Sequence, residues 1–226
     1  MNMRVMINKI AFPIIKYLRG KNKFTFEDKS YEYFIHENSW NTERVVEIPI
    51  ILDYIEKNKN KRILEFGNVL EQFIPINWDV LDKYSNGSRV IHQDIVDFTP
   101  EEKYDLIISI STLEHVGFNE DVENIGHGAD KIEQNKILIA LKNIKENCLN
   151  PNGKLIITVP LGYNNYLDKE ILNHNFGFDK LIFMKRLTRN NKWAETAFLE
   201  KDIVYGHPFN NANYICVCEY DNTNNI

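Results

Sequence analysis

The sequence is poor in cysteine, in positive charge and in long apolar runs, and each shortage excludes a class of protein. Three cysteines among 226 residues cannot form a disulfide framework, so we expect a reducing compartment, the cytoplasm. A formal net charge of -5 provides no overall basic field, so no nucleic-acid partner is expected. The apolar run at residues 10–15 is short and contains Pro13, so we expect neither a membrane span nor a signal peptide there.

The few cysteines also argue against a metal site. Cys216 and Cys218 stand two apart in the strand-like stretch "NYICVCEY", so both side chains should point to one face and lie in the core. No second Cys/His pair has a matching spacing, and we therefore expect no metal.

The chain shows no internal repeat and no low-complexity linker, which indicates one main domain. We expect an N-terminal helical extension at residues 1–40, a domain at 41–220 and a loose asparagine-rich tail at 221–226. The extension is expected to hold an amphipathic helix packed on the domain, followed by a polar connection, "RGKNKFTFEDKS". A helix that binds a membrane surface or a partner is the alternative.

Residues 41–58 carry apolar side chains at helical spacing, and Asn41 or Thr42 can cap the helix. Pro49 lacks the N–H for one helical hydrogen bond. The segment is therefore either one kinked helix or a turn followed by a helix that begins near Pro49.

After residue 60, apolar strands alternate with helical segments. The strand-like stretches are "RILEF", "WDVLDKY", "RVIHQDI", "YDLIISIS", "KLIITVP", "KLIFMKRLT" and "ANYICVCEY". A helix is expected at about residues 130–148, followed by a turn in "LNPNG". The pattern predicts an α/β fold, a three-layer Rossmann-like domain whose sheet is mostly parallel with an antiparallel edge.

Glycine is scarce where a nucleotide-binding fold would need it. In "KRILEFGNVLEQF", Gly67 follows the first strand of the domain, but Asn68, Val69 and Leu70 come next. A dinucleotide site uses a glycine-rich turn to cradle its pyrophosphate, so this loop argues against NAD or FAD. A cofactor without a pyrophosphate does not need that turn.

Polar residues follow four successive strands, in the order of a known family. Glu65 and Gly67 come after the first strand, Asp82 after the second, Asp94 after the third and "STLEHVG" after the fourth. "LNPNGKLIITVP" then joins a helix to the fifth strand. Over residues 44–220 this order resembles class I S-adenosylmethionine-dependent methyltransferases.

The resemblance implies S-adenosylmethionine as cofactor, bound at the carboxyl ends of these strands. In such a site Asp82 would hold the ribose hydroxyls and Asp94 the adenine, while Gly67, Asn68 and Ser111 would contact the cofactor. The alternatives are a turn cap for Asp82, a solvated residue or helix cap for Asp94, and an ordinary strand-to-helix turn for Gly67.

Two further residues are expected at the cofactor. Glu65 is also counted among the cofactor-binding residues, more as an organiser of the loop than as a direct ligand. Arg44 is a candidate for the methionine carboxylate, because a guanidinium can grip a carboxylate with two hydrogen bonds. A salt bridge from Arg44 to Glu47 is the alternative.

His115 is the candidate catalytic base, and Glu114 is the second choice. An imidazole with a pKa of about 6.5 can take a proton from a hydroxyl at neutral pH. The alternative is that this histidine only shapes the loop.

The expected reaction is methyl transfer to a hydroxyl of a small molecule or saccharide, a form of glycan modification. Acceptor contacts are sought in the later loops, at Tyr163, Trp193, His207 and Asn211, and in a mobile loop around His127. The alternatives are a non-catalytic protein that retains the fold, or a methyltransferase acting on RNA or protein. The sequence leaves the oligomeric state open.

Overall fold

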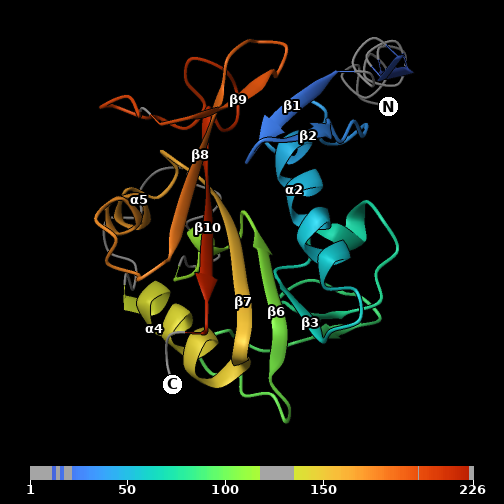
Figure 1. Ribbon diagram of the computed structural model, residues 1–226, viewed down its shortest axis with the longest axis vertical. Coiled ribbons are helices and arrows are strands. Elements are labelled where there is room, and N and C mark those ends of the chain that lie inside the picture. Colours follow the sequence, from blue (N-terminus) through green and yellow to red (C-terminus); the bar gives the residue numbers. More distant parts are fainter. Residues whose placement is uncertain (1–11, 14–15, 18–21, 118–134, 198, 224–226) are drawn as a thin grey trace.

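An eight-stranded mixed sheet forms the centre of the protein, in the order β5-β4-β3-β6-β7-β10-β8-β9 (Figure 1). The structure is a computed structural model, which describes residues 12–13, 16–17, 22–117, 135–197 and 199–223. The sheet strands are β3 (Ile63–Phe66), β4 (Asp79–Leu81), β5 (Val90–Ile91), β6 (Tyr104–Ile110), β7 (Leu149–Pro160), β8 (Lys180–Arg186), β9 (Trp193–Thr196) and β10 (Tyr214–Asp221).

The first five strands of this sheet are parallel, and the other edge is antiparallel. β10 runs antiparallel to both β7 and β8, and β9 runs antiparallel to β8. The chain moves outward from β3 through β4 to β5, then returns to place β6 and β7 on the other side of β3. The order therefore reverses between β3 and β6, and ligands of open α/β sheets bind at such a point. The predicted fold class is confirmed.

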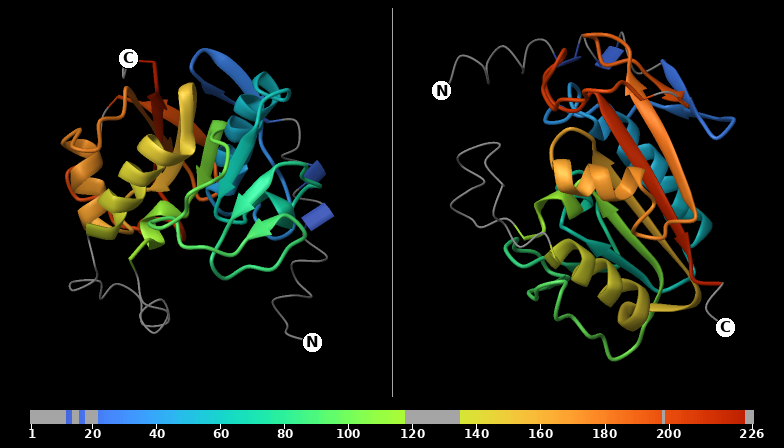
Figure 2. Two further views of the ribbon diagram at one scale, coloured as in Figure 1. Left: turned by 90° about the horizontal axis from the view of Figure 1, so that it is seen from below. Right: turned by 90° about the vertical axis from the view of Figure 1, so that its left-hand side faces the viewer.

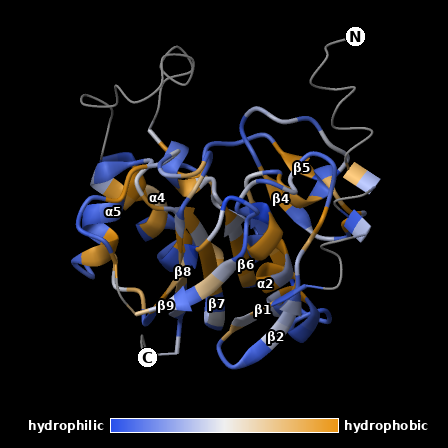
Figure 3. Cartoon of the chain, turned by 90° about the horizontal axis from the view of Figure 1, so that it is seen from above, coloured by the Kyte–Doolittle hydropathy of each residue, from blue (hydrophilic) through white to orange (hydrophobic). Residues whose placement is uncertain are grey.

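Helices cover both faces of the sheet. Helix α2 (Arg44–Lys57) lies on one face, and α4 (Asn135–Asn143), the π-helical turn η3 (Ile144–Cys148) and α5 (Asn165–Leu172) lie on the other (Figures 1 and 2). Each face of the sheet has its own apolar core, and strand β6 contributes to both. Leu106, Ile108 and Ile110 pack on the α2 side, and Ile107 packs on the α4 side. Apolar residues accordingly concentrate between the layers (Figure 3).

Helix α2 continues through Pro49 without ending there. The carbonyl of Val45, four residues earlier, loses its helical donor and instead accepts a hydrogen bond of 3.0 Å from the N–H of Phe34. The residue before the helix is Glu43 rather than Asn41 or Thr42, although the Thr42 hydroxyl does accept from the N–H of Arg44 at 3.3 Å.

The expected polar connection is wrong in part, because it contains strand residues. Strands β1 (Lys23–Phe26) and β2 (Lys29–Glu32) form an antiparallel hairpin. Phe24 and Phe26 alternate with polar residues and are buried in the same core as α2, so the hairpin packs on the domain. The helix expected before it lies largely outside the described residues.

Several other expectations need correction. A further antiparallel strand, β9, covers Trp193–Thr196, where Trp193 was expected in a loop. Helix α5 begins at Asn165, two residues after Tyr163, which was also expected in a loop. Strand β10 extends through Asp221, and the N–H of Asn222 donates to Gly153, so the tail begins later than residue 221. "LNPNG" lies within the bounds of β7, where the pairing with β6 shifts register.

Candidate functional site

The side chain of Glu65 holds the loop after β3 in place. Its Oε1 accepts the N–H groups of Val69 at 2.9 Å and Leu70 at 2.8 Å, and its Oε2 accepts the Nε1–H of Trp78 at 3.1 Å. The side chain is fully buried, and burial raises the pKa of this carboxyl although the hydrogen bonds oppose the rise. Glu65 therefore organises the loop in this structure.

The backbone N–H groups of the same loop donate hydrogen bonds to acceptors of the protein itself. Gly67 donates to the carbonyl of Leu81 at 2.9 Å and Asn68 donates to Oδ2 of Asp82 at 2.9 Å, while the next two N–H groups go to Glu65. A short 3-10 helix, η1 (Leu70–Gln72), follows at once. These four N–H groups are therefore not free to bind an anion, in contrast to a glycine-rich phosphate loop.

Gly67 is required for both its backbone angle and its lack of a side chain. Its φ is +88°, and a β-carbon there would lie 2.2 Å from Oγ1 of Thr112. The loop after β3 therefore touches the segment after β6 directly.

Asp82 and Asp94 lie at the ends of β4 and β5, as expected. Oδ2 of Asp82 accepts from Asn68, and its Oδ1 accepts from the N–H groups of Tyr84 at 2.8 Å and Ser85 at 2.7 Å. Burial raises the pKa of Asp82, but these bonds outweigh it and hold the pKa below its usual value. Asp94 accepts from the N–H of Val96 at 3.2 Å. Both residues therefore act as turn caps here.

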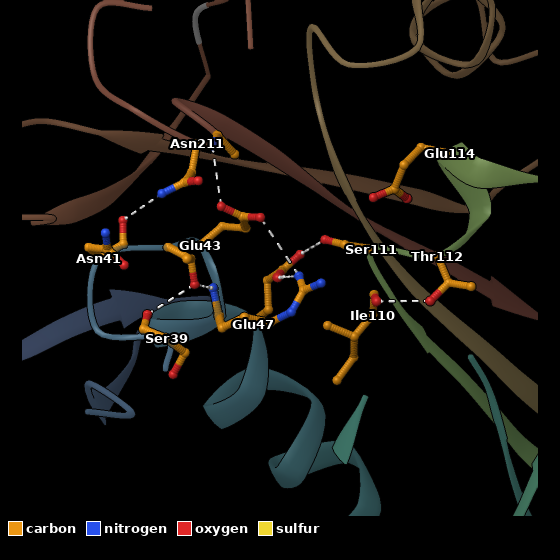
Figure 4. Close-up of polar contacts among 12 residues, drawn as sticks. Ser39, Asn41, Glu43, Glu47, Ile110, Ser111, Thr112, Glu114 and Asn211 are labelled. Carbon is orange, nitrogen blue, oxygen red and sulfur yellow. Dashed lines mark hydrogen bonds and ion pairs between the residues drawn. The ribbon is translucent and has the colours of Figure 1, made fainter. Parts of the chain in front are cut away.

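A second group of polar residues lies where β6 ends and α2 begins (Figure 4). The hydroxyl of Ser111 donates to Oε1 of Glu47 at 2.7 Å, and Nη1 of Arg44 donates to Oε2 of the same carboxylate. Ser111 has a φ of +39°, an uncommon angle for a residue with a side chain. The salt bridge considered for Arg44 is thus present.

Two more carboxylates lie near this pair. Oε1 of Glu43 is 3.8 Å from Nη1 of Arg44, and its Oε2 accepts the N–H of Ala212 at 3.2 Å. Glu114, in the 3-10 helix η2 (Leu113–His115), is 1% exposed, and its Oε2 has no hydrogen-bond partner among the described residues. Burial raises the pKa of both Glu43 and Glu114.

His115 projects beside this group, toward aromatic residues. Its Nε2 is 3.8 Å from Oε1 of Glu114, and its ring centroid is 5.0 Å from that of Tyr163. Tyr163 in turn contacts the ring of Tyr205 edge-on, with centroids 5.2 Å apart. The side chain of His115 is 37% exposed, so a ligand can reach it.

The structure thus brings the predicted residues together in two groups. One group joins Glu65, Gly67, Asn68 and Asp82 through the loop after β3. The other contains the remaining candidates except Asp94: Arg44, Ser111, Glu114 and His115. Asp94 belongs to neither group, and its Oδ2 lies 3.5 Å from Nζ of Lys83.

Some expected acceptor residues are elsewhere. Trp193 is a core residue of β9, 3% exposed, whose Nε1–H donates to Asn191 at 2.6 Å. Asn211, by contrast, lies beside the second polar group, where it donates to the carbonyl of Asn41 at 3.3 Å (Figure 4). His207 is exposed, and His127 lies outside the described residues.

The sequence analysis did not single out three residues of the site, Glu43, Thr112 and Tyr205, and it considered Glu47 only as a salt-bridge partner of Arg44. Glu43 and Glu47 are four apart at the start of a helix, so one face carries both, and this spacing could have drawn attention to them. Tyr205 had no comparable signal, because its place depends on how the β9–β10 connection folds back on Gly162.

Within the described ranges no cluster of three or more His, Cys, Asp or Glu side chains is arranged to hold a metal ion. None of the helices described is long and apolar enough to cross a membrane.

No protein-family profile and no curated protein matches the chain. Solved structures that resemble it include the N-methyltransferase NodS from Bradyrhizobium japonicum WM9 in complex with S-adenosyl-L-homocysteine, with 12% identity and a TM-score of 0.43 over 81% of this chain and 93% of that chain. TehB from Haemophilus influenzae has 14% identity and a TM-score of 0.45 over 81% and 64%. An S-adenosylmethionine-dependent methyltransferase from Clostridium acetobutylicum ATCC 824 has 14% identity and a TM-score of 0.39 over 95% and 98%. Similarity of this size does not establish a shared activity.

Proposed function

We propose that the protein is an S-adenosylmethionine-dependent methyltransferase that acts on a hydroxyl of a small molecule or saccharide. One observation carries the proposal: the strand order brings Gly67, Asp82, Asp94 and the Ser111–His115 segment to the carboxyl ends of β3 to β6, where the order reverses.

The residues present suit the cofactor. Among the described residues, the buried oxygens without a partner include Oδ1 of Asn68 on the β3 loop and Oε2 of Glu114 beyond β6. S-Adenosylmethionine offers donors of both kinds, ribose hydroxyls and an ammonium group. Asp82 would accept from the ribose with the remaining lone pair of Oδ2, and Asp94 would lie toward the adenine.

The cofactor supplies a methyl group made electrophilic by the sulfonium. The protein's part is to hold the acceptor oxygen in line with the carbon–sulfur bond and to exclude water from the site. His115 takes the hydroxyl proton as the oxygen–carbon bond forms and the carbon–sulfur bond breaks. The partly exposed imidazole beside Tyr163 supports this role.

A non-catalytic protein that retains the fold is the second candidate. Its support is that Asp82 already accepts three backbone N–H groups and that Thr112 fills the space beside Gly67.

Equilibrium dialysis with methyl-labelled S-adenosylmethionine separates the two candidates. We expect wild-type protein to retain the label, Asp94→Asn to retain several-fold less, and Asp97→Asn, an exposed residue of the same turn, to match wild type. A folded wild-type protein that retains no label would favour the non-catalytic candidate.

A further inference from the structure

The amino-acid end of the cofactor is a zwitterion. Among the described residues, the polar group where β6 ends and α2 begins offers both free donors, on Arg44, and a free acceptor, on Glu114. We propose that Arg44 binds the α-carboxylate and Glu114 binds the α-ammonium, while Glu47 and Ser111 hold Arg44 in place. The inference rests on the proposed function and adds to it the residues that replace the glycine-rich loop.

The loop after β3 cannot take this role. Its four N–H groups, from Gly67 to Leu70, all donate to protein acceptors. A carboxylate placed there would have to break bonds to Glu65 or Asp82, which are themselves anionic groups. The α-carboxylate must therefore find its donors elsewhere.

Arg44 has donors to spare. Only its Nη1 contacts Glu47 and Glu43, and its Nη2 and Nε make no hydrogen bond to the described residues. Its side chain is 20% exposed, so a ligand can reach part of it. A planar guanidinium can bind a carboxylate through two parallel hydrogen bonds.

Glu47 and Ser111 hold the side chain of Arg44 in place. Glu47 is fully buried and divides its two oxygens between Arg44 and the hydroxyl of Ser111. Ser111 is itself anchored, because its N–H donates to the carbonyl of Thr158 at 2.9 Å. Glu47 and Ser111 therefore act as positioning residues, which connect the end of β6 to the start of α2.

Glu114 supplies the acceptor. Glu114 is only 1% exposed. The close-up shows its carboxylate extending toward the side on which Glu43 and Ser111 lie (Figure 4). Its Oε2 has no partner within the described part of the chain. A buried carboxylate oxygen without a donor is costly, and a bound ammonium would satisfy it.

The charges of the group also favour a cation. Among the described residues, the guanidinium of Arg44 is surrounded by three buried carboxylates, those of Glu43, Glu47 and Glu114. Burial disfavours the ionised forms of Glu43 and Glu114. An α-ammonium bound beside Glu114 would stabilise its ionised form and pair with its Oε2.

Three ligands test the assignment by calorimetry. S-Adenosyl-L-homocysteine carries both charged groups, decarboxylated S-adenosylmethionine keeps the amine only, and 5′-methylthioadenosine has neither. We expect Glu114→Gln to weaken the first two by about 10- to 100-fold, as for loss of a charged hydrogen bond, and to leave the third unchanged. Arg44→Gln should weaken the first ligand only.

Glu56→Gln, an exposed substitution near the end of α2, is the matched control and should bind all three ligands as wild type does. Equal losses for all three ligands in Glu114→Gln would show a structural role and overturn the inference, as would no loss at all. A wild-type protein that binds none of the three would overturn the proposed function as well, so the two failures are distinguishable.

Discussion

Thr112 occupies the space into which a side chain on Gly67 would project, with its Oγ1 only 2.2 Å from the position of a β-carbon. This contact joins the segment after β6 to the loop after β3, at the point where the strand order reverses. Any residue other than glycine must displace Thr112, and with it the start of η2.

Gly67→Ala should therefore lower both stability and affinity for S-adenosyl-L-homocysteine. Gly206→Ala is the matched control, because Gly206 has a similar φ of +82° but no atom within 4 Å of the added carbon. The control should cost about 1 to 2 kcal/mol for its backbone angle alone, and Gly67→Ala clearly more. Urea unfolding of both variants measures the difference, and equal costs would contradict the packing of Thr112.

Glu65→Gln should destabilise the protein although it changes few atoms. The carboxylate accepts from three N–H groups, whereas the amide keeps one acceptor oxygen and turns a donor toward either Trp78 or the loop. The expected loss is about 2 to 3 kcal/mol in urea unfolding. Glu71→Gln, a half-buried neighbour, should cost much less. A stable Glu65→Gln variant would show that the loop does not depend on this side chain.

Arg186 should be among the most sensitive positions on the antiparallel edge. It is 5% exposed and donates to the carbonyls of four residues, namely Asn41, Thr188, Arg189 and Asn210. Arg186→Lys keeps the charge but cannot reach all four, so we expect a loss of about 3 kcal/mol or more in the free energy of unfolding. Lys185→Ala, next to it but paired with Glu200 at the surface, should change stability by less than about 1 kcal/mol.

Asp168 should make stability depend on pH near neutrality. Burial raises its pKa from 3.8 to about 7, against one bond from the N–H of Gly162. Because the folded state holds this proton more tightly than the unfolded state, stability falls as pH rises from about 4 to 7. Between pH 5 and 7 we expect a decrease on the order of 1 to 2 kcal/mol from this group. Asp168→Asn should remove that decrease, and an unchanged pH profile in urea unfolding would refute the assignment.

The sheet could be predicted because most of its strands are apolar on both faces. Strand β6 is buried on both sides, and β10 alternates between the two cores, so each shows as a continuous apolar run. The hairpin at Lys23–Glu32 was harder to predict, because polar and charged residues alternate with Phe24 and Phe26 and leave no continuous apolar run. Its place depends on packing against α2 rather than on local sequence.

The site was predicted only in outline. The strand ends at Asp82 and Asp94 follow from the order of strands, but the bonds that cap their own turns depend on how each loop closes. Ser111 and Glu47 are 64 residues apart, and their contact arises only when α2 packs on the end of β6. Local patterns contain no information on such pairs, so Arg44 could be proposed from its chemistry but not positioned.

The central claim is that this fold binds S-adenosylmethionine, and isothermal titration of the wild-type protein with S-adenosylmethionine and S-adenosyl-L-homocysteine tests it most directly. We predict saturable binding of both at one site per chain, with dissociation constants of roughly 1 to 100 µM, in the usual range for substrates. Absence of binding to protein that is shown to be folded would contradict the account.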